Sequence, residues 1–262
     1  MSATLVYSTM AAPLILITND DGIDAPGVVA LERALAPVGR TCTAAPLTEQ
    51  SAASRRITLR RPIRYERRGQ SRYGIEGTPC DCVMMAVTLL LEERPDLVVS
   101  GINNGPNLGE NIYYSGTVAA AAEGAKYGIP AMAVSVNQRS SIDYEPSARV
   151  AAGLAARILA DGLPSGIVLN VNVPVGKAAG ISVTRQCCKI SRNYMVETRD
   201  PMNRPYYWMH EDVPLENAEE GSDYAAIRDG RISITPLQFD HTAHTEIDGL
   251  SRALEGFELD PV

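Results

Sequence analysis

Residues Met10–Gly27 read M-A-A-P-L-I-L-I-T-N-D-D-G-I-D-A-P-G, an apolar run that ends abruptly in polar residues. The part at 14–18 is short, apolar and rich in β-branched residues, which is typical of a parallel strand covered on both faces. Asn19, Asp20 and Asp21 follow directly. The sequence therefore places two carboxylates at the end of a buried strand.

A turn and a helix are expected next. Gly22 permits a sharp change of chain direction, which takes Asp20 and Asp21 out of the strand so that both can face one point. Asp24 is then expected to cap, and Pro26 to begin, a helix with one apolar face.

The paired carboxylates have two interpretations. Two anions held side by side repel each other and raise the pKa of one of them unless a cation lies between them, so the pair indicates a metal site. Alternatively, Asp21-Gly22 is ordinary turn chemistry and Asp24 is only a cap.

Composition limits the class of protein. The 262 residues, 45% of them hydrophobic, suffice for one large domain, with or without an appendage. The net charge of −7 argues against a nucleic-acid polymer as the main partner, because such proteins need a basic face. No apolar run approaches the roughly 20 residues of a membrane span. Three arginine pairs are interpreted as a solvated hairpin surface, or alternatively as a local attraction for an anionic substrate: Arg55-Arg56, Arg60-Arg61 and Arg67-Arg68.

Metal sites based on cysteine or histidine are not indicated. The five cysteines lack C-x-x-C spacing and the chain has only three histidines, so any metal must rely on oxygen ligands. The cysteine usage, and an N-terminus without the positive segment of a secretory signal, favour the cytoplasm. Residues 1–9 are interpreted as a disordered extension, or as preceding a true start at Met10.

The spacing of the apolar runs predicts an α/β layer sandwich, because helical patterns separate five expected strands and parallel strands need such crossovers. These strands are expected at 14–18, 41–46, 97–102, 131–136 and 167–173. A polar hairpin is expected between Ile57 and Glu76. A helix capped by Thr78, with Pro79 as its first residue, is expected to follow.

The C-terminal part has a different character. Residues 187–222 are rich in Arg, Tyr, Pro and acidic residues and contain the single tryptophan, Trp208. We interpret this region as an appendage with aromatic anchors, a kind of arm that often makes oligomer contacts. Its strands are expected near 181–186, 205–209 and 231–236.

A second informative segment runs from Asp96 to Pro130. A buried strand, D-L-V-V-S-G-I, precedes the loop N-N-G-P-N-L-G-E-N-I-Y-Y-S-G-T and an Ala-rich helix. A loop this rich in Gly and Asn is costly to order, which indicates a ligand. Ser115, Gly116 and Thr117 begin the helix, where free N–H groups and the helix dipole favour phosphate. Alternatively, Ser115 or Thr117 is a plain N-cap. Neither a Walker motif nor a G-x-G-x-x-G motif is present.

The two segments should meet, because ligands of open parallel sheets bind beyond the carboxyl ends of the strands. A hydroxyl from Ser51 or Ser54 and the amide oxygen of Asn103 would join the two carboxylates there. Such an oxygen-only shell suits Mg²⁺, Mn²⁺ or Ca²⁺.

Five motifs occur in order: L-I-L-I-T-N-D-D-G-I-D-A-P-G, V-V-S-G-I-N-N-G-P-N-L-G, Y-S-G-T-V-A-A-A-A-E-G, L-N-V-N-V-P and I-S-I-T-P-L. Together they resemble the SurE family of stationary-phase survival phosphatases. The resemblance implies a Rossmann-like three-layer α/β sandwich with a mainly parallel sheet and a β-rich C-terminal extension. It also implies a metal-dependent 5′-nucleotidase for nucleoside 5′-monophosphates, with 3′-monophosphates as a further class, that forms a homodimer or homotetramer.

The resemblance also implies roles for individual residues. One divalent cation, Mg²⁺ or Mn²⁺ with Ca²⁺ as an alternative in a crystal, is expected to be bound by Asp20, Asp21, Ser51 and Asn103. Asp20 and Asp21 are also the expected catalytic residues. Phosphate is expected to be bound by Asn107, Ser115, Gly116 and Thr117. The family's A-P-D is A-P-L at Leu47, and Gln50 stands where a basic residue often precedes the serine, which bears on the choice of Ser51 over Ser54. The expected domains are an extension at 1–13, a catalytic core at 14–180 and an oligomerisation extension with a terminal helix at 181–262.

The expected reaction is hydrolysis of a phosphomonoester by water that the metal activates. A covalent aspartyl phosphate is the alternative mechanism. His244 is a candidate proton donor to the leaving oxygen, or alternatively a capping or packing residue before the terminal helix. A haloacid-dehalogenase-like phosphatase would need an aspartate at position 19, where the chain has Asn19. A binding module that holds a nucleotide without hydrolysing it is the remaining alternative.

Overall fold

The computed structural model describes residues 12–138, 142–187, 192–212 and 214–257, so the expectations for residues 1–11 and for Cys188 lie outside the described residues. Its centre is a nine-stranded sheet of order β3-β4-β2-β1-β5-β6-β7-β11-β8. The five central strands run parallel to one another and confirm the five expected from the sequence. They are β1 (Leu14–Thr18), β2 (Arg40–Pro46), β5 (Leu97–Asn104), β6 (Ala131–Val136) and β7 (Val168–Val173).

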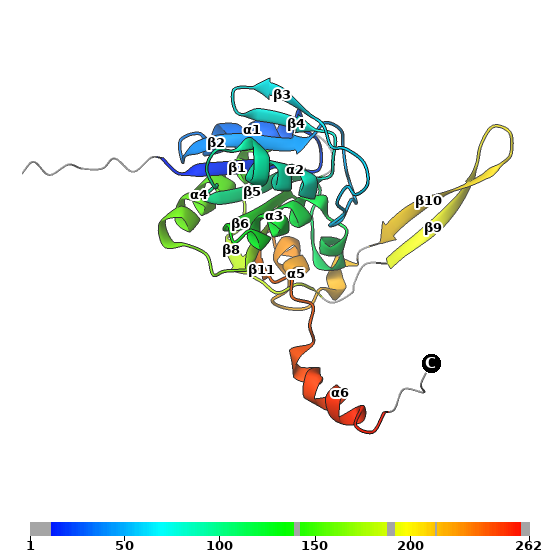
Figure 1. The fold of residues 1–262 in the computed structure, drawn as a ribbon. Coiled ribbons are helices and arrows are strands. Elements are labelled where there is room, and N and C mark those ends of the chain that lie inside the picture. Colours follow the sequence, from blue (N-terminus) through cyan, green and yellow to red (C-terminus); the bar gives the residue numbers. More distant parts are fainter. Residues whose placement is uncertain (1–11, 139–141, 188–191, 213, 258–262) are drawn as a thin grey trace, which may run out of the picture.

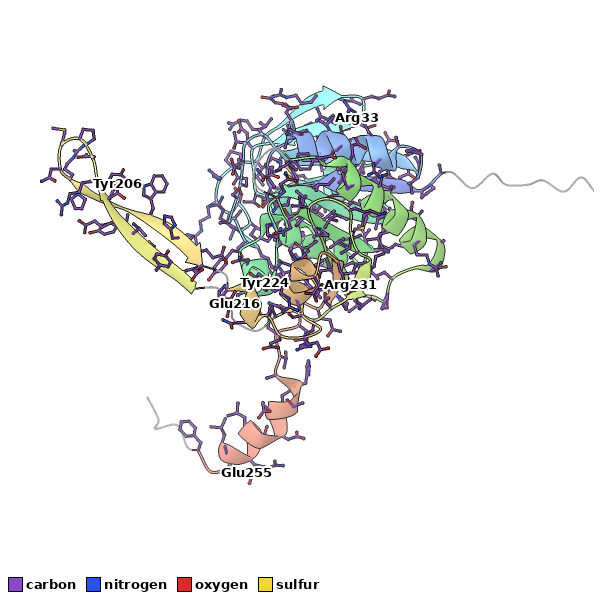
Figure 2. All side chains as sticks on the ribbon, turned by 180° about the vertical axis from the view of Figure 1, so that it is seen from behind. Arg33, Tyr206, Glu216, Tyr224, Arg231 and Glu255 are labelled. Carbon is purple, nitrogen blue, oxygen red and sulfur yellow. The ribbon has the colours of Figure 1, made fainter. Side chains whose placement is uncertain are left out.

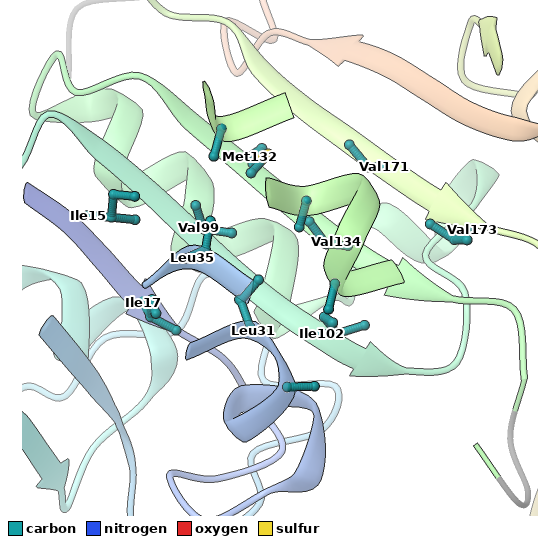
Figure 3. Packing of buried hydrophobic residues seen from close by; sticks show 14 of the residues in the cluster. Ile15, Ile17, Leu31, Leu35, Val99, Ile102, Met132, Val134, Val171 and Val173 are labelled. Carbon is teal, nitrogen blue, oxygen red and sulfur yellow. The ribbon is translucent and has the colours of Figure 1, made fainter. Parts of the chain in front are cut away.

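Helices cover both faces of this sheet and make three layers, as expected (Figure 1). On one face, α1 (Pro26–Leu35) and α4 (Glu145–Asp161) pack against alternate strand residues such as Ile15 and Ile17 (Figure 3). On the other face, α2 (Pro79–Met85) and α3 (Gly116–Lys126) pack against Leu16. The strands are apolar on both sides because both sides are covered.

The first helices begin almost as the sequence predicts. Pro26 is the first residue of α1, but Ala25 occupies the N-cap position, so the expectation that Asp24 caps this helix is wrong. A cap must directly precede the first helical residue. The exposed Asp24 carboxylate instead accepts a hydrogen bond from Arg72 at 3.2 Å. Helix α2 begins with the expected cap, since Thr78 exchanges hydrogen bonds with Asp81 in a capping box.

The polar hairpin is shorter than expected. Its strands are β3 (Tyr65–Gly69) and β4 (Arg72–Ile75), so residues 57–64 precede it without forming a strand. Pro62 lies in that segment and lacks the N–H group that a strand ladder needs. Because β4 pairs in parallel with β2, the hairpin forms one edge of the main sheet.

The C-terminal strands divide between two sheets, which corrects the expectation that they lie together in an appendage. Strand β11 (Ile232–Leu237) pairs antiparallel with β7, and β8 (Ile181–Val183) pairs in parallel with β11. Both therefore belong to the main sheet, where Ile232 and Ile234 complete the core beside α4.

Only β9 (Arg192–Arg199) and β10 (Pro205–Asp212) form a separate hairpin, which extends away from the body of the protein (Figure 1). The sequence did not predict β9. The described residues of this hairpin are largely exposed, and a strand without a buried face carries no apolar alternation to recognise.

The remaining elements are short. They are η1 (Ala86–Leu90), η2 (Gly109–Tyr113), η3 (Leu215–Asn217), α5 (Asp223–Arg228), η4 (His244–Glu246) and α6 (Ile247–Ala253). Within the described ranges, no helix combines the length and apolar character needed to cross a membrane.

Candidate active site

The turn after β1 brings both predicted carboxylates out of the strand. Gly22 has a φ of +107°, a conformation that side-chain-bearing residues rarely adopt. The amide of Asn19 donates to the Gly22 carbonyl at 2.9 Å and closes the turn. The Asn19 side chain therefore stabilises the backbone of the turn. Asp20 and Asp21 follow it at the carboxyl end of the central strand.

Asp20 is buried, with 4% of its surface exposed, against the start of α3. The Thr117 hydroxyl donates to Asp20 Oδ1 and also lies 3.1 Å from Asn103 Oδ1. Three predicted site residues, from the turn after β1, from β5 and from α3, thus meet at one hydroxyl group. Burial raises the pKa of the Asp20 carboxyl to about 6; the Thr117 hydrogen bond opposes this rise and the charge of Asp21 adds to it.

Asp21 is less buried and is fixed from the other side of the site. Its Oδ2 atom accepts a hydrogen bond from the backbone N–H of Asn104 at 3.1 Å. Burial raises the pKa of Asp21, as does the negative charge of Glu49. Among the residues that the structure describes, no Lys, Arg or His forms an ion pair with either Asp20 or Asp21.

This donor set fits a divalent cation. Two desolvated carboxylates with no positive partner in the described chain are electrostatically incomplete, and a bound cation would lower both pKa values again. The carboxylate of Asp20 and the amide oxygen of Asn103 are the hard oxygen donors that Mg²⁺ and Mn²⁺ prefer.

The loop after β2 lies beside this group. The N–H of Gln50 donates to the Asp20 carbonyl at 2.7 Å, which ties the loop to the carboxylate turn. The Ser54 hydroxyl donates to the Tyr113 carbonyl at 2.6 Å, whereas the exposed Ser51 hydroxyl donates to Glu49 at 2.6 Å. Both hydroxyls therefore donate a hydrogen bond within the chain, and the choice of Ser51 over Ser54 as the metal ligand stays a prediction.

The predicted phosphate-binding residues have different surroundings. Ser115 is the N-cap of α3, and its hydroxyl accepts from the Val118 N–H at 3.1 Å. Gly116 and Thr117 form the first turn, directly against Asp20. Asn107 is buried, and its side chain donates to Ser135 Oγ at 2.8 Å. Phosphate binding by these four residues remains an expectation.

Several residues near the site were not predicted from the sequence. Glu49 is a third carboxylate near Asp21, and its position in the loop after β2 was the available signal. Asn170 and Asn172 interrupt an otherwise apolar strand, and that alternation was the signal for them.

His244 was predicted as a proton donor. It is exposed, with Nε2 2.7 Å from Asp240 Oδ2. Its role as a proton donor stays a hypothesis.

Comparison with known proteins identifies the family of the chain. Residues 15–193 match the family described as "Survival protein SurE". This chain belongs to the SurE family. It is 44% identical to "5′-nucleotidase SurE 1" of Thermus thermophilus, over 92% of this chain and 98% of that protein. It is also 44% identical to "5′-nucleotidase SurE" of Myxococcus xanthus, over 94% of each chain.

A solved structure supports the same family and the same fold. The crystal structure of the SurE protein from Aquifex aeolicus matches with a TM-score of 0.84 and 38% identity, covering 92% of this chain and 99% of that one. SurE membership and the α/β fold with a mainly parallel sheet, both expected from the sequence, are thereby confirmed.

Proposed function

We propose that this protein is a metal-dependent 5′-nucleotidase that hydrolyses nucleoside 5′-monophosphates to nucleoside and phosphate, with 3′-monophosphates as a further substrate class. The observation that carries the proposal is the meeting of Asp20 and Asn103 at the Thr117 hydroxyl, at the N-terminus of α3. Hard oxygen donors beside the N-terminus of a helix suit a phosphate bound together with a cation. The names of the SurE relatives agree with this reaction.

One divalent cation, Mg²⁺ or Mn²⁺, would be held by Asp20, Asp21, Ser51 and Asn103. When bound, such an ion polarises a phosphate oxygen and lowers the pKa of a coordinated water molecule.

The chain's own residues then have distinct tasks. Thr117 holds the Asp20 carboxylate in one orientation, and the Asn104 N–H holds Asp21. Because Asp21 Oδ2 is engaged by that N–H, Asp21 Oδ1 is the oxygen that would bind the cation and orient the attacking water. The Thr117 N–H also faces the Asp20 carboxylate. The Gly116 N–H and the helix dipole would stabilise the negative charge of the phosphate oxygens.

The nucleoside is expected to lie over the exposed end of the 104–115 loop. Tyr113 and Tyr114 are more than half exposed there, and Asn104 is exposed at the start of the same loop. Aromatic rings of this kind stack on bases, and the amide can hydrogen bond to them. Comparing kcat/KM for 5′-monophosphates, 3′-monophosphates and sugar phosphates tests this part. A clear lead for the sugar phosphates would contradict it.

The proposed reaction is tested most directly with p-nitrophenyl phosphate. Purified protein should hydrolyse it with added Mn²⁺ or Mg²⁺, lose activity in EDTA and regain it when the metal is restored. A nucleotide that binds in the presence of Mn²⁺ but is never hydrolysed would instead identify a binding module. Net retention of configuration at a chiral phosphorus, instead of the inversion expected for direct attack by water, would identify the aspartyl phosphate mechanism.

We further propose that the chain self-associates as a homodimer or homotetramer through the β9–β10 hairpin. Tyr207 and Trp208 are each 60% exposed, and Met209 is exposed beside them. Figure 2 shows the labelled Tyr206 far out on this hairpin, away from Tyr224 on the body of the protein. Contiguous exposed apolar side chains of this kind mark contact surfaces. We also propose a cytoplasmic location, which the free cysteines Cys42, Cys80, Cys82 and Cys187 favour.

A further inference from the structure

The motif L-N-V-N-V-P places two asparagines inside the sheet. Asn170 and Asn172 lie on the central strand β7, and both are fully buried. Because side chains alternate along a strand, they face the side opposite to Val171 and Val173, which pack in the α1/α4 core. A buried amide costs free energy unless it is hydrogen bonded, so the partners of these two side chains need an explanation.

Both side-chain amides form hydrogen bonds with the backbone of one residue, Asn107. Asn172 Oδ1 accepts from the Asn107 N–H at 2.8 Å, and Asn172 Nδ2 donates to the Asn107 carbonyl at 3.0 Å. Asn170 Nδ2 donates to the same carbonyl at 2.8 Å. The Asn172 amide thus pairs with the N–H and C=O of a single loop residue, as a residue of a neighbouring strand would, which requires a side chain that both donates and accepts.

The strand itself gains little from this arrangement. Asn170 Oδ1 is buried and has no hydrogen-bond partner among the described residues. Leaving such an oxygen without a partner is unfavourable, and an apolar side chain would avoid that cost. The two asparagines therefore stabilise the loop that contains Asn107 more than they stabilise strand β7.

That loop joins the two halves of the candidate active site. Asn103 and Asn104 lie at its start, where the Asn104 N–H reaches Asp21. Thr117, which reaches Asp20, lies just beyond its end. Asn107 is inside this segment, so its position affects both carboxylates.

We propose that Asn172, assisted by Asn170, is a positioning residue that holds the 104–115 loop in the geometry needed for binding metal and phosphate. The inference rests on the proposed function, and it adds residues that touch neither the metal ligands nor the substrate. Loss of a group that supports a ligand shell typically costs about 10- to 100-fold in metal affinity or activity.

The test uses full-length protein with Asn172→Leu and Asn172→Ala, and Asn170→Ala as a milder change. Thr184→Val is the matched control. Thr184 Oγ1 lies 2.8 Å from both Ser233 Oγ and Thr235 Oγ1, so the control also removes buried hydrogen bonds, but at the β8–β11 edge of the sheet. The readouts are melting temperature, amide hydrogen exchange of peptides covering 104–115, Mn²⁺ affinity by calorimetry, and kcat and KM with p-nitrophenyl phosphate.

We expect the Asn172 variants to exchange faster in the 104–115 peptides, to bind Mn²⁺ more weakly and to lose about 10- to 100-fold in kcat/KM at temperatures well below melting. Asn170→Ala should have a smaller effect in the same direction. The control should lose melting temperature only.

The inference is overturned if the Asn172 variants lose melting temperature as the control does but keep wild-type exchange, Mn²⁺ affinity and kcat/KM. If Asn172→Leu does not fold, Asn172→Ala and Asn170→Ala decide the question. Absence of metal-dependent hydrolysis in the wild type would instead reject the proposed function, while hydrogen exchange and Mn²⁺ affinity would still decide whether Asn172 positions the loop.

Discussion

Gly116 lies so close to Asp20 that a Cβ atom added at position 116 would be 2.8 Å from both Asp20 Cβ and Asp20 Oδ2. Helix α3 can therefore begin against the carboxylate only because residue 116 has no side chain. The Ser115-Gly116-Thr117 sequence thus has a steric reason at its centre, in addition to its place at a helix N-terminus.

Gly116→Ala is expected to displace Asp20 or the first turn of α3, and so to lower kcat/KM by about 100-fold, as a misplacement of the order of 1 Å can do. Gly153→Ala is the control, because it also lies in a helix but has no heavy atom within 4 Å of the added Cβ. The control should keep wild-type kinetics and gain about 0.5–1 kcal/mol of stability. Equal kinetics for the two variants would show that the close approach is unimportant.

Asp20→Asn and Asp21→Asn should each abolish metal-dependent hydrolysis, because each removes one of the two negative charges proposed to bind the cation. The far-ultraviolet circular dichroism should stay that of the wild type, since the carboxylates lie beyond the end of β1 and outside the hydrophobic clusters on the two faces of the sheet. Wild-type turnover by either variant in EDTA would contradict the proposed metal site.

Asp20→Asn should also stabilise the metal-free protein at neutral pH. The pKa of Asp20 is about 6 in the folded protein against an ordinary 3.8, so the folded state binds more protons than the unfolded state between these values. Stability therefore falls as pH rises from about 4 to 6, and the loss is complete above pH 6. The amide has no charge to desolvate, and we expect a gain on the order of 1–3 kcal/mol at pH 8.

Urea denaturation in EDTA at pH 4 and at pH 8 measures this difference. The gain from Asp20→Asn should be present at pH 8 and nearly absent at pH 4. A variant that is no more stable than the wild type at pH 8 would show that the buried charge is compensated.

Thr117→Val should lower kcat/KM by about 10- to 100-fold, because it removes the hydroxyl shared by Asp20 and Asn103 while keeping the volume of the side chain. Thr117→Ser keeps the hydroxyl and should restore most of the activity. Both variants should be assayed over a range of Mn²⁺ concentrations, since the loss is expected to appear partly as weaker metal binding. A valine variant as active as the serine variant would reject this role.

Replacing both Tyr207 and Trp208 with Ser should shift the protein toward the monomer mass in light scattering at micromolar concentration, because the contact proposed for the hairpin loses its largest side chains. The melting temperature should change little, since neither side chain is buried within the chain. A wild type that is monomeric throughout this range would remove the basis of the assembly proposal.

Short-range features could be predicted from the sequence. The strand 14–18 followed by Asn19, Asp20 and Asp21, the turn at Gly22, and the cap of α2 at Thr78 all depend on residues a few positions apart. Their signals are local chain stereochemistry and hydrophobic periodicity, which the sequence carries directly. The alternation of strands and helices was enough to give the fold class.

Long-range pairings were decided only by the tertiary structure. The hydrogen bond from Thr117 to Asp20 joins residues 97 positions apart, and that from Asn107 to Asn172 joins residues 65 positions apart. Whether β11 joins the main sheet depends on a free edge at β7, which no local pattern describes. The sequence by itself therefore determined which residue types stand at the ends of the strands. The packing of the sheet and its helices decided which of them meet, because distant side chains come together only when the whole core has formed.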